Sequence, residues 1–256
     1  MSDLTVVLTS CRRHDLLVKT LDSFFASNDY PLHEFIVIED SDQVEVEKIA
    51  ARYPGQPLRF IVNGNNIGQH RSIDKAYACV TTPYILHLED DWEFPKPGVV
   101  RQALDVLKAD DDLLLVSLRS DKDMPANIRR LPIFGQPAAH RKVGPLAHHV
   151  WFSFTFNPTV KRLSDYKLLP GGYAAFNSES ALSLHYKNQG RIMGWLVDAG
   201  VDHLGWERSN YTPVEQKSFL TLLGKANRFF SMRTMRKWKN SITRRVDHLR
   251  RKQRLK

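Results

Sequence analysis

The sequence has 256 residues, of which 42% are apolar, enough for one large domain or one domain with an appendage. It has no apolar run near the roughly 20 residues of a membrane span, and its two cysteines, Cys11 and Cys79, give neither a disulfide framework nor a CxxC metal motif. Thirteen Lys and Arg residues and one acid of this +9 chain lie in 225–256, which leaves a slightly acidic remainder of 24 basic and 27 acidic residues (37 less 13, and 28 less 1).

The first half of the chain alternates between strand and helix patterns. Apolar runs typical of buried strands lie at 4–10, 34–41, 58–63, 84–89 and 112–118. Helical patterns lie between them, at 16–25, 44–53, 71–80 and 98–110. This alternation predicts an α/β fold with a largely parallel sheet between two layers of helices. Because the crossovers are right-handed, the carboxyl ends of the strands meet at one edge, where open α/β sheets bind ligands.

The second half of the chain has a weaker pattern. From Arg119 to Pro170 the sequence is irregular and rich in proline. Residues 178–189 then predict a helix with Ser178 as its N-cap, ended by a glycine. Short strands are predicted at 191–197 and 201–206.

Glycine is absent from the turn that follows the first predicted strand. The first glycine of the chain is Gly55. A dinucleotide-binding fingerprint or a P-loop needs glycines in the turn after an early strand. We therefore expect a metal ion, rather than a glycine-rich loop, to neutralise the phosphates of any bound nucleotide.

Three acids, Glu89, Asp90 and Asp91, end the fourth predicted strand. Mg²⁺ and Mn²⁺ prefer carboxylate oxygens and are often held by one or two carboxylates together with substrate phosphates. Adjacent strand residues point to opposite faces, so we do not expect all three acids to bind one ion. Asp91 is positioned to reach a metal, and Glu89 or Asp90 to accept a hydrogen bond from ribose. The alternative is a solvated acidic loop that caps the next helix.

Two further polar segments follow neighbouring strands. Glu39 and Asp40 end the second strand, where an acid can accept a hydrogen bond from a base N–H, although an Asx-type turn is the alternative. Arg71 opens the helix after the third strand, where its charge and the helix N-terminus both favour a phosphate. A surface arginine is the alternative interpretation there.

Four segments in chain order, VVLTSCRRHDLLVKTLDSFF, FIVIEDSD, NGNNIGQHRSIDKAY and YILHLEDDWEF, together resemble the nucleotide-sugar half of family 2-like, GT-A fold glycosyltransferases. The resemblance covers residues 4–116 well and continues more loosely to about Tyr211. It implies a GT-A-like three-layer αβα sandwich with a mostly parallel central sheet.

The resemblance also implies roles for individual residues. Thr9 and Cys11 would line the base pocket, and Asp40 would contact the base. The acid triplet occupies the place of the DxD motif, with Asp91 as the metal ligand. Because this chain has Glu at the first position, the ribose contact stays open between the first two acids. The full set of implied donor-binding residues is Thr9, Cys11, Arg13, Glu39, Asp40, Arg71, Glu89 and Asp90.

The second half of this family usually supplies an acid that activates the acceptor hydroxyl. The candidate is Glu179, at a predicted helix start near the PGGY loop at 170–173. Its alternative is an ordinary first-turn glutamate favoured by the helix dipole. His203 falls where some GT-A enzymes place a metal- or phosphate-binding histidine, and we predict it as a second ligand of Mn²⁺ or Mg²⁺. A structural histidine is the alternative.

The basic tail is predicted to form an amphipathic helix with one apolar stripe. Such a helix suits an anionic membrane, at about 1 kcal/mol per nearby basic residue. RNA binding and a solvated face are the alternatives, and we do not expect a nucleic-acid partner. The predicted division is 1–118 for the nucleotide-sugar-binding half, 119–218 for the acceptor-binding and catalytic half, and 219–256 for the tail.

The predicted protein is a metal-dependent glycosyltransferase that uses a UDP-sugar and inverts the anomeric carbon. Its acceptor would be a glycan or glycolipid of bacterial envelope polysaccharide or lipopolysaccharide synthesis. The start of the chain has no signal-peptide pattern, so we expect a cytoplasmic location, peripheral on the inner face of the membrane. The alternative is a non-catalytic GT-A-like protein that binds RNA or membrane through its tail. A sugar nucleotidyltransferase would need a glycine-rich loop after the first strand.

Overall fold

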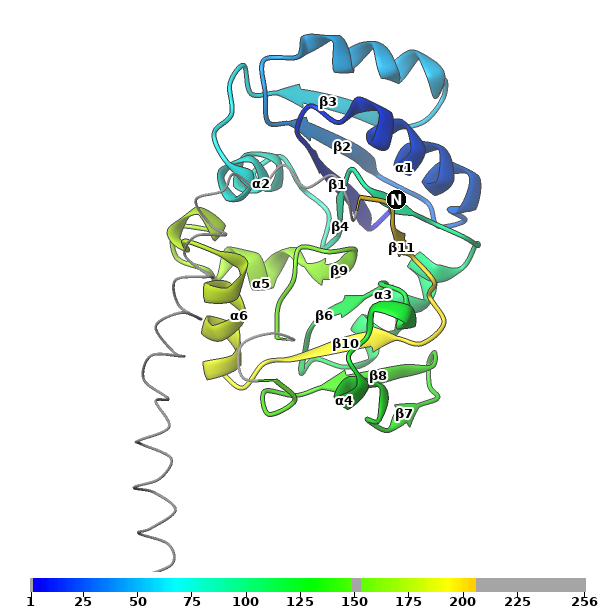
Figure 1. Ribbon diagram of the computed structural model, residues 1–256, viewed down its shortest axis with the longest axis vertical. Coiled ribbons are helices and arrows are strands. Elements are labelled where there is room, and N and C mark those ends of the chain that lie inside the picture. Colours follow the sequence, from blue (N-terminus) through cyan, green and yellow to red (C-terminus); the bar gives the residue numbers. More distant parts are fainter. Residues whose placement is uncertain (1, 149–152, 206–256) are drawn as a thin grey trace, which may run out of the picture. The chain divides into compact units, whose positions relative to one another are not determined.

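The structure is a computed structural model that describes residues 2–148 and 153–205 (Figure 1). The predicted tail at 219–256 and its membrane contact at 225–256 lie outside the described residues. No helix within the described ranges is long and apolar enough to cross a membrane.

Strands and helices alternate as predicted in the first half of the chain. The strands are β1 (Leu4–Ser10), β2 (Glu34–Glu39), β3 (Leu58–Val62), β4 (Tyr84–Glu89), β5 (Trp92–Glu93), β6 (Leu113–Ser117), β7 (Ile133–Phe134), β8 (His140–Val143), β9 (Thr159–Arg162), β10 (Ile192–Leu196) and β11 (Asp202–His203). The α-helices are α1 (His14–Ser27), α2 (Gln69–Tyr77), α3 (Val99–Ala109), α4 (Ala126–Arg129), α5 (Leu163–Lys167) and α6 (Glu179–Asn188). The 3₁₀ helices are η1 (Val44–Arg52), η2 (Asp121–Asp123) and η3 (Tyr173–Ala175).

One large sheet forms the centre of the molecule (Figure 1). Its strand order is β3-β2-β1-β4-β9-β6-β10-β8-β7, and β11 pairs with β5 in a separate two-stranded sheet. In the described part of the large sheet, β8 and β9 run against the direction shared by the other strands. The predicted mostly parallel central sheet is therefore confirmed.

Each face of the sheet carries its own apolar core, which gives the three predicted layers. Leu21 of α1 and Leu104 of α3 are buried in the cluster on one face. Ile73 of α2 and Leu182 of α6 are buried in the cluster on the other. Each strand contributes side chains to both cores, because successive side chains point to opposite faces of the sheet.

The segment from residue 119 to residue 170, predicted as irregular, contains β7, β8, β9, α4 and α5. The strand β9 matters most, because it is antiparallel and lies between β4 and β6. Its sequence, TVKR, carries two basic residues in four positions, so it lacks the apolar run by which buried strands are recognised. The helix predicted at 44–53 forms the 3₁₀ helix η1 instead.

The strand register brings the predicted polar strand ends to one edge. Ser10 of β1 is in register with Glu39 of β2, and Thr9 of β1 is in register with Glu89 of β4. All three strands are parallel, so their carboxyl ends and the loops that follow share this edge.

Candidate active site

Asp90 is fully buried and is held by the loop that follows β1. The guanidinium of Arg13 donates to both of its carboxylate oxygens, and the Arg13 Nε to Asp90 Oδ2 distance is 3.3 Å. The backbone N–H of Cys11 donates to the same Oδ2 at 3.4 Å. Burial raises the pKa of Asp90 to about 7, although the charge of Arg13 opposes this shift. Asp90 therefore ties the β1 turn to the end of β4.

Asp91 and His203 lie together, while their predicted role as metal ligands stays a prediction. The Asp91 carboxylate is almost fully buried, and its Oδ2 lies 3.2 Å from His203 Nε2. Arg13 donates to the same Oδ2 at 2.7 Å. Burial disfavours the carboxylate of Asp91, but the hydrogen bond from His203 and the charge of Arg13 outweigh it and lower the pKa. Asp91 is thus held ionised.

The small sheet of β5 and β11 explains how His203 reaches this place. His203 is in register with Trp92, and the centroids of their rings are 4.8 Å apart. The backbone N–H of Leu204 also donates to the carbonyl of Asp91 at 2.7 Å. A segment more than 100 residues away in sequence is thereby fixed against the acid triplet.

The atoms around Asp91 fit a divalent cation whose remaining coordination positions are filled by a bound ligand. No group of three or more His, Cys, Asp or Glu side chains that could hold a metal occurs among residues 2–148 and 153–205. Asp91 Oδ1, however, is buried and accepts no hydrogen bond from the described residues. Mg²⁺ is commonly held by one or two carboxylates, with the other positions filled by water and substrate phosphates. Asp91 and His203 match such a partial set.

Glu39 and Asp40 are both engaged by the protein's own loops. The Oε1 atom of Glu39 accepts hydrogen bonds from the Arg12 backbone N–H at 2.9 Å and from Ser41 Oγ at 2.5 Å. Asp40 accepts from the backbone N–H groups of Ile67 at 2.8 Å and Gly68 at 2.9 Å. Asp40 therefore holds the turn before α2 through contacts distant in sequence, which differ from the local hydrogen bond of an Asx-type turn, and its contact with a base stays a prediction.

Of the two predicted base-pocket residues, Cys11 contacts Asp40 and Thr9 contacts β4. Thr9 is buried, and its hydroxyl donates to the carbonyl of Leu88 at 3.5 Å. The Cys11 thiol donates to the Asp40 carbonyl at 3.4 Å and accepts from Asn66 Nδ2 at 3.5 Å. The structure thus brings Cys11 and Asp40 into contact, while the contact of Thr9, Cys11 and Asp40 with a nucleotide stays a prediction.

The start of α2 offers a residue that the sequence analysis missed. Arg71 is exposed in the first turn of this helix, and its phosphate contact stays a prediction. Gln69, at the first helical position, donates from Nε2 to Glu89 Oε1 at 2.9 Å. Gln69 is uncharged, whereas the charge of Arg71 favours a phosphate. The sequence pattern therefore pointed to Arg71 and missed Gln69.

Glu179 begins α6 as predicted, and the Ser178 hydroxyl caps this helix by accepting from the Ala181 N–H at 3.2 Å. Burial raises the pKa of Glu179, while hydrogen bonds from Thr155 and Phe156 oppose the shift. Burial raises the pKa of Glu89 to about 7, and the charges of Asp91 and Glu179 add to this shift. The predicted base therefore lies within electrostatic reach of the end of β4.

The loop that precedes α6 is fixed to α2 by Asp74. Its carboxylate accepts hydrogen bonds from the Tyr166 hydroxyl at 2.9 Å and from the backbone N–H groups of Tyr173 at 2.9 Å and Ala174 at 2.8 Å. Gly172 has a φ of +64°, and a Cβ at this position would lie 2.7 Å from Asp74 Oδ1. One helix therefore contacts both the end of β4 and the loop of the predicted acceptor side.

We expect Asp74→Ala to lower the free energy of unfolding by about 2–4 kcal/mol, because two backbone N–H groups lose their acceptor. Urea unfolding followed by circular dichroism measures the change. Asp105→Ala is the matched control, since Asp105 is an exposed acid on α3, and should stay within about 0.5 kcal/mol of the parent. Equal losses in both variants would remove this role from Asp74.

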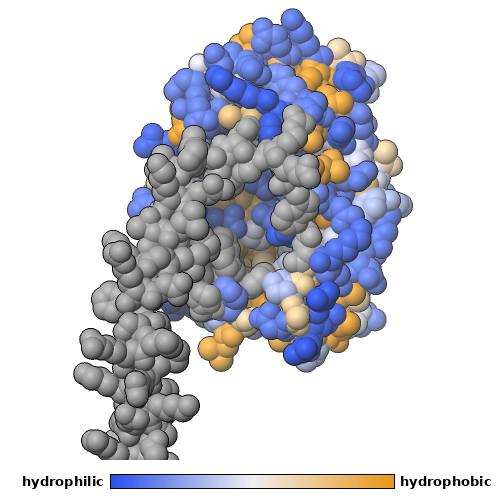
Figure 2. Space-filling view, in the orientation of Figure 1, coloured by the Kyte–Doolittle hydropathy of each residue, from blue (hydrophilic) through white to orange (hydrophobic). Residues whose placement is uncertain are grey.

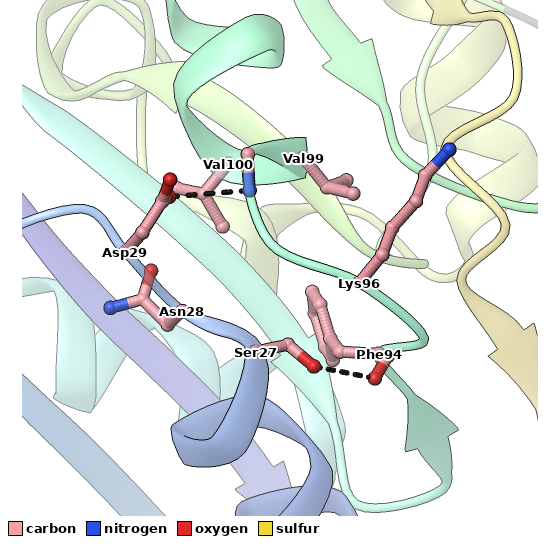
Figure 3. Close-up of a pocket in the computed structure, with 8 residues that line it drawn as sticks. Ser27, Asn28, Asp29, Phe94, Lys96, Val99 and Val100 are labelled. Carbon is pink, nitrogen blue, oxygen red and sulfur yellow. Dashed lines mark hydrogen bonds between the residues drawn. The ribbon is translucent and has the colours of Figure 1, made fainter.

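Figure 2 shows a hollow near the middle of one face, in the region where Figure 1 draws β4 and β9. A separate shallow pocket lies between the end of α1 and the start of α3 (Figure 3). Two of its polar groups are already paired, Ser27 with the Phe94 carbonyl and Asp29 with the Gly98 N–H. None of the predicted site residues lines this pocket, so it is not the candidate site.

A mostly parallel sheet with flanking helices and acids at its carboxyl edge is the architecture of GT-A-type glycosyltransferases. A mannosyltransferase, PcManGT from Pyrobaculum calidifontis in complex with GDP-Man and Mn²⁺, is similar with a TM-score of 0.61 at 17% identity. The match covers 81% of this chain and 58% of that one. S. aureus TarS 1-349 in complex with UDP-GlcNAc is similar with a TM-score of 0.61 at 13% identity, over 83% of this chain and 62% of that one.

The chain belongs to glycosyl transferase family 2, whose sequence model matches residues 5–181. No curated protein matches the sequence. The chain spans about three fifths of the length of the two solved proteins, 58% and 62%. At these identities the structural likeness shows the fold.

Proposed function

We propose that the protein transfers a sugar from a nucleotide-sugar, a UDP-sugar, to an acceptor hydroxyl with inversion at the anomeric carbon. The observation that carries this proposal is the meeting of Asp91 and His203 with Glu89 and Glu179 at one sheet edge. Membership of glycosyl transferase family 2 supports the reaction class. Of the similar structures, one is a complex with UDP-GlcNAc and another a complex with GDP-Man and Mn²⁺.

Asp91 and His203 would hold Mn²⁺ or Mg²⁺, which when bound neutralises the diphosphate leaving group. Glu89 would accept a hydrogen bond from ribose, since it is partly exposed whereas Asp90 is fully buried and engaged by Arg13. Of the two acids that the sequence left open for this contact, we therefore propose Glu89.

Glu179 would accept the proton of the attacking hydroxyl. Burial raises its pKa, which makes the ionised carboxylate a stronger base. Attack from the face opposite the departing diphosphate would invert the anomeric carbon, by analogy with glycoside hydrolysis. Thr9, Cys11 and Asp40 would surround the base of the nucleotide.

We further propose that residues 1–118 bind the nucleotide-sugar and that residues 119–218 bind the acceptor. The acceptor would be a glycan or glycolipid of the bacterial cell envelope, reached by a cytoplasmic enzyme at the inner face of the membrane. The basic residues of 225–256 support this placement, because they favour an anionic surface.

Titration calorimetry with UDP, UDP-GlcNAc and GDP-Man, each with and without Mn²⁺, tests the proposal. We expect a heat of binding that depends on Mn²⁺ for UDP or for UDP-GlcNAc. On turnover, the nucleotide should be released as UDP. The non-catalytic alternative predicts no metal-dependent heat. Binding of none of these ligands, with or without Mn²⁺, would overturn the proposed function.

A further inference from the structure

Lys161 is a buried cation that the donor-binding site does not use. It lies on β9, in register with Ile85 of β4 and Leu115 of β6, and its side chain is 4% exposed. Its Nζ atom lies 4.5 Å from the ring centroid of Phe154 and 5.2 Å from that of Phe156. The ring faces stabilise an ammonium group, but burial of a charge is costly unless the charge is also paired.

A short chain of hydrogen bonds connects Lys161 to the candidate base. Lys161 Nζ donates to the carbonyl of Thr155 at 3.3 Å. Hydrogen bonding from the Thr155 hydroxyl and the Phe156 backbone N–H lowers the pKa of Glu179, against the effect of burial. The backbone N–H of Asn157 donates to Thr155 Oγ1 at 3.2 Å, which leaves the hydroxyl proton of Thr155 available for a donation of its own. Lys161 therefore fixes the residue whose other groups orient Glu179.

The charges of this cluster complement one another. Burial lowers the pKa of Lys161 to about 7, and the charges of Glu179 and Glu89 oppose this shift. The charge of Lys161 in turn lowers the pKa of Glu179, against the effect of burial. The other ionisable groups that face Lys161 or Glu179 are His87 of β4, Arg119 after β6 and Tyr173 of η3.

We propose that Lys161 is a positioning residue for Glu179, holding the Thr155 segment that aims the carboxylate. This inference rests on the proposed function. In the transfer step the acceptor oxygen bonds to the anomeric carbon, and the bond from that carbon to the diphosphate oxygen breaks. The electron pair of the broken bond stays with the diphosphate, and the hydroxyl proton passes to Glu179. Lys161 exchanges no proton with the substrate.

Donor hydrolysis tests the inference, because water replaces the unidentified acceptor. Release of UDP from UDP-GlcNAc, and of GDP from GDP-Man, is measured with Mn²⁺ across the pH range. A base must be unprotonated, so activity falls below the pKa of Glu179. Because Lys161→Met removes the cation that lowers this pKa, the acidic limb of kcat should move to higher pH. We expect kcat to fall about tenfold or more on that limb, since one pKa unit is a tenfold change, while the Kd for UDP stays within about twofold.

Lys142→Met is the matched control. Lys142 is a lysine of β8 that pairs with Asp110 at 2.7 Å, and this variant removes one positive charge without touching the cluster. Its pH profile should equal that of the parent. Thr155→Val keeps the shape of the side chain but removes the hydroxyl whose hydrogen bond lowers the pKa of Glu179, so it should move the acidic limb in the same direction by at least as much. If Lys161→Met does not fold, Thr155→Val still tests whether Thr155 connects Lys161 to Glu179.

The double variant Lys161→Met with Glu179→Gln separates this role from a structural one. If Lys161 acts through Glu179, the lysine change adds no further loss of kcat to Glu179→Gln. If Lys161→Met and Thr155→Val both kept the parental pH profile while Glu179→Gln was slow, the inference about Lys161 would be overturned. The assignment of Glu179 as the base would then stand. Fully additive losses would also overturn the inference about Lys161. A parental rate in Glu179→Gln would instead remove the base assignment on which the inference rests.

Discussion

Loss of Mn²⁺-dependent nucleotide binding is the expected result for Asp91→Ala. The variant removes the carboxylate whose Oδ1 is buried with no hydrogen-bond donor among the described residues. It also leaves His203 without the acid that fixes its ring at 3.2 Å. A bound metal supplies several kcal/mol of charge stabilisation, so we expect the affinity for UDP with Mn²⁺ to fall by about 100-fold or more. Calorimetry with and without Mn²⁺ measures the loss.

Asp42→Ala is the control for this prediction, because Asp42 is an exposed acid near the same sheet edge, paired with Arg12 at 2.8 Å. Exposed ion pairs contribute about 0–1 kcal/mol, so its binding of UDP and Mn²⁺ should match the parent. Thermal unfolding of both variants shows whether the fold is retained. Undiminished metal-dependent binding and turnover in folded Asp91→Ala would remove Asp91 as the metal ligand.

Glu179→Gln should abolish most turnover while leaving donor binding intact. The amide keeps an oxygen that can accept the hydrogen bonds of Thr155 and Phe156, but it cannot take a proton from the acceptor. General-base catalysis contributes roughly 10²–10⁴-fold, and we expect a loss of kcat of this size. Stopped assays of UDP release and calorimetry with UDP measure the two effects separately.

The competing interpretation of Glu179 is an ordinary first-turn glutamate, and Glu45→Gln is the control for it. Glu45 is exposed in the first turn of η1. A helix-dipole interaction is worth about 0.3–1 kcal/mol of stability and does not affect turnover. If Glu179→Gln behaved like Glu45→Gln, with a small loss of stability and parental turnover, Glu179 would not be the base.

The first half of the fold was predictable because its elements carry strong patterns. The strand runs at 4–10 and 84–89 are continuous and apolar, and Leu21 and Leu104 fall on the buried faces of their helices. The strand β9 was missed because Lys161 and its neighbour read as exposed residues. Tertiary contacts, chiefly aromatic rings from distant segments, make the burial of that lysine possible.

The contacts among the predicted site residues could be anticipated only in part, and the roles of these residues stay predictions. The sequence analysis named both Asp91 and His203 as metal ligands, and the structure places the two side chains in contact. The partners of Asp40 and Asp90 could not be predicted, because they are backbone N–H groups and an arginine brought together by loop conformation. Gln69 and Lys161 gave no signal because their roles depend on neighbours far away in the sequence.

The place of β9 in the sheet has a consequence for how the chain acquires its structure. Among the described strands, β6 pairs with β9 and β10 and makes no ladder with β4. A nascent chain that ends near residue 118 therefore has β4 and β6 with no partner between them. Residues 159–162 must be synthesised before the gap can close, so folding of the two predicted halves is coupled and slow non-local pairing is required. The boundary at 118 separates proposed tasks of the molecule, but it is not a place at which the chain can be divided into independently folding pieces.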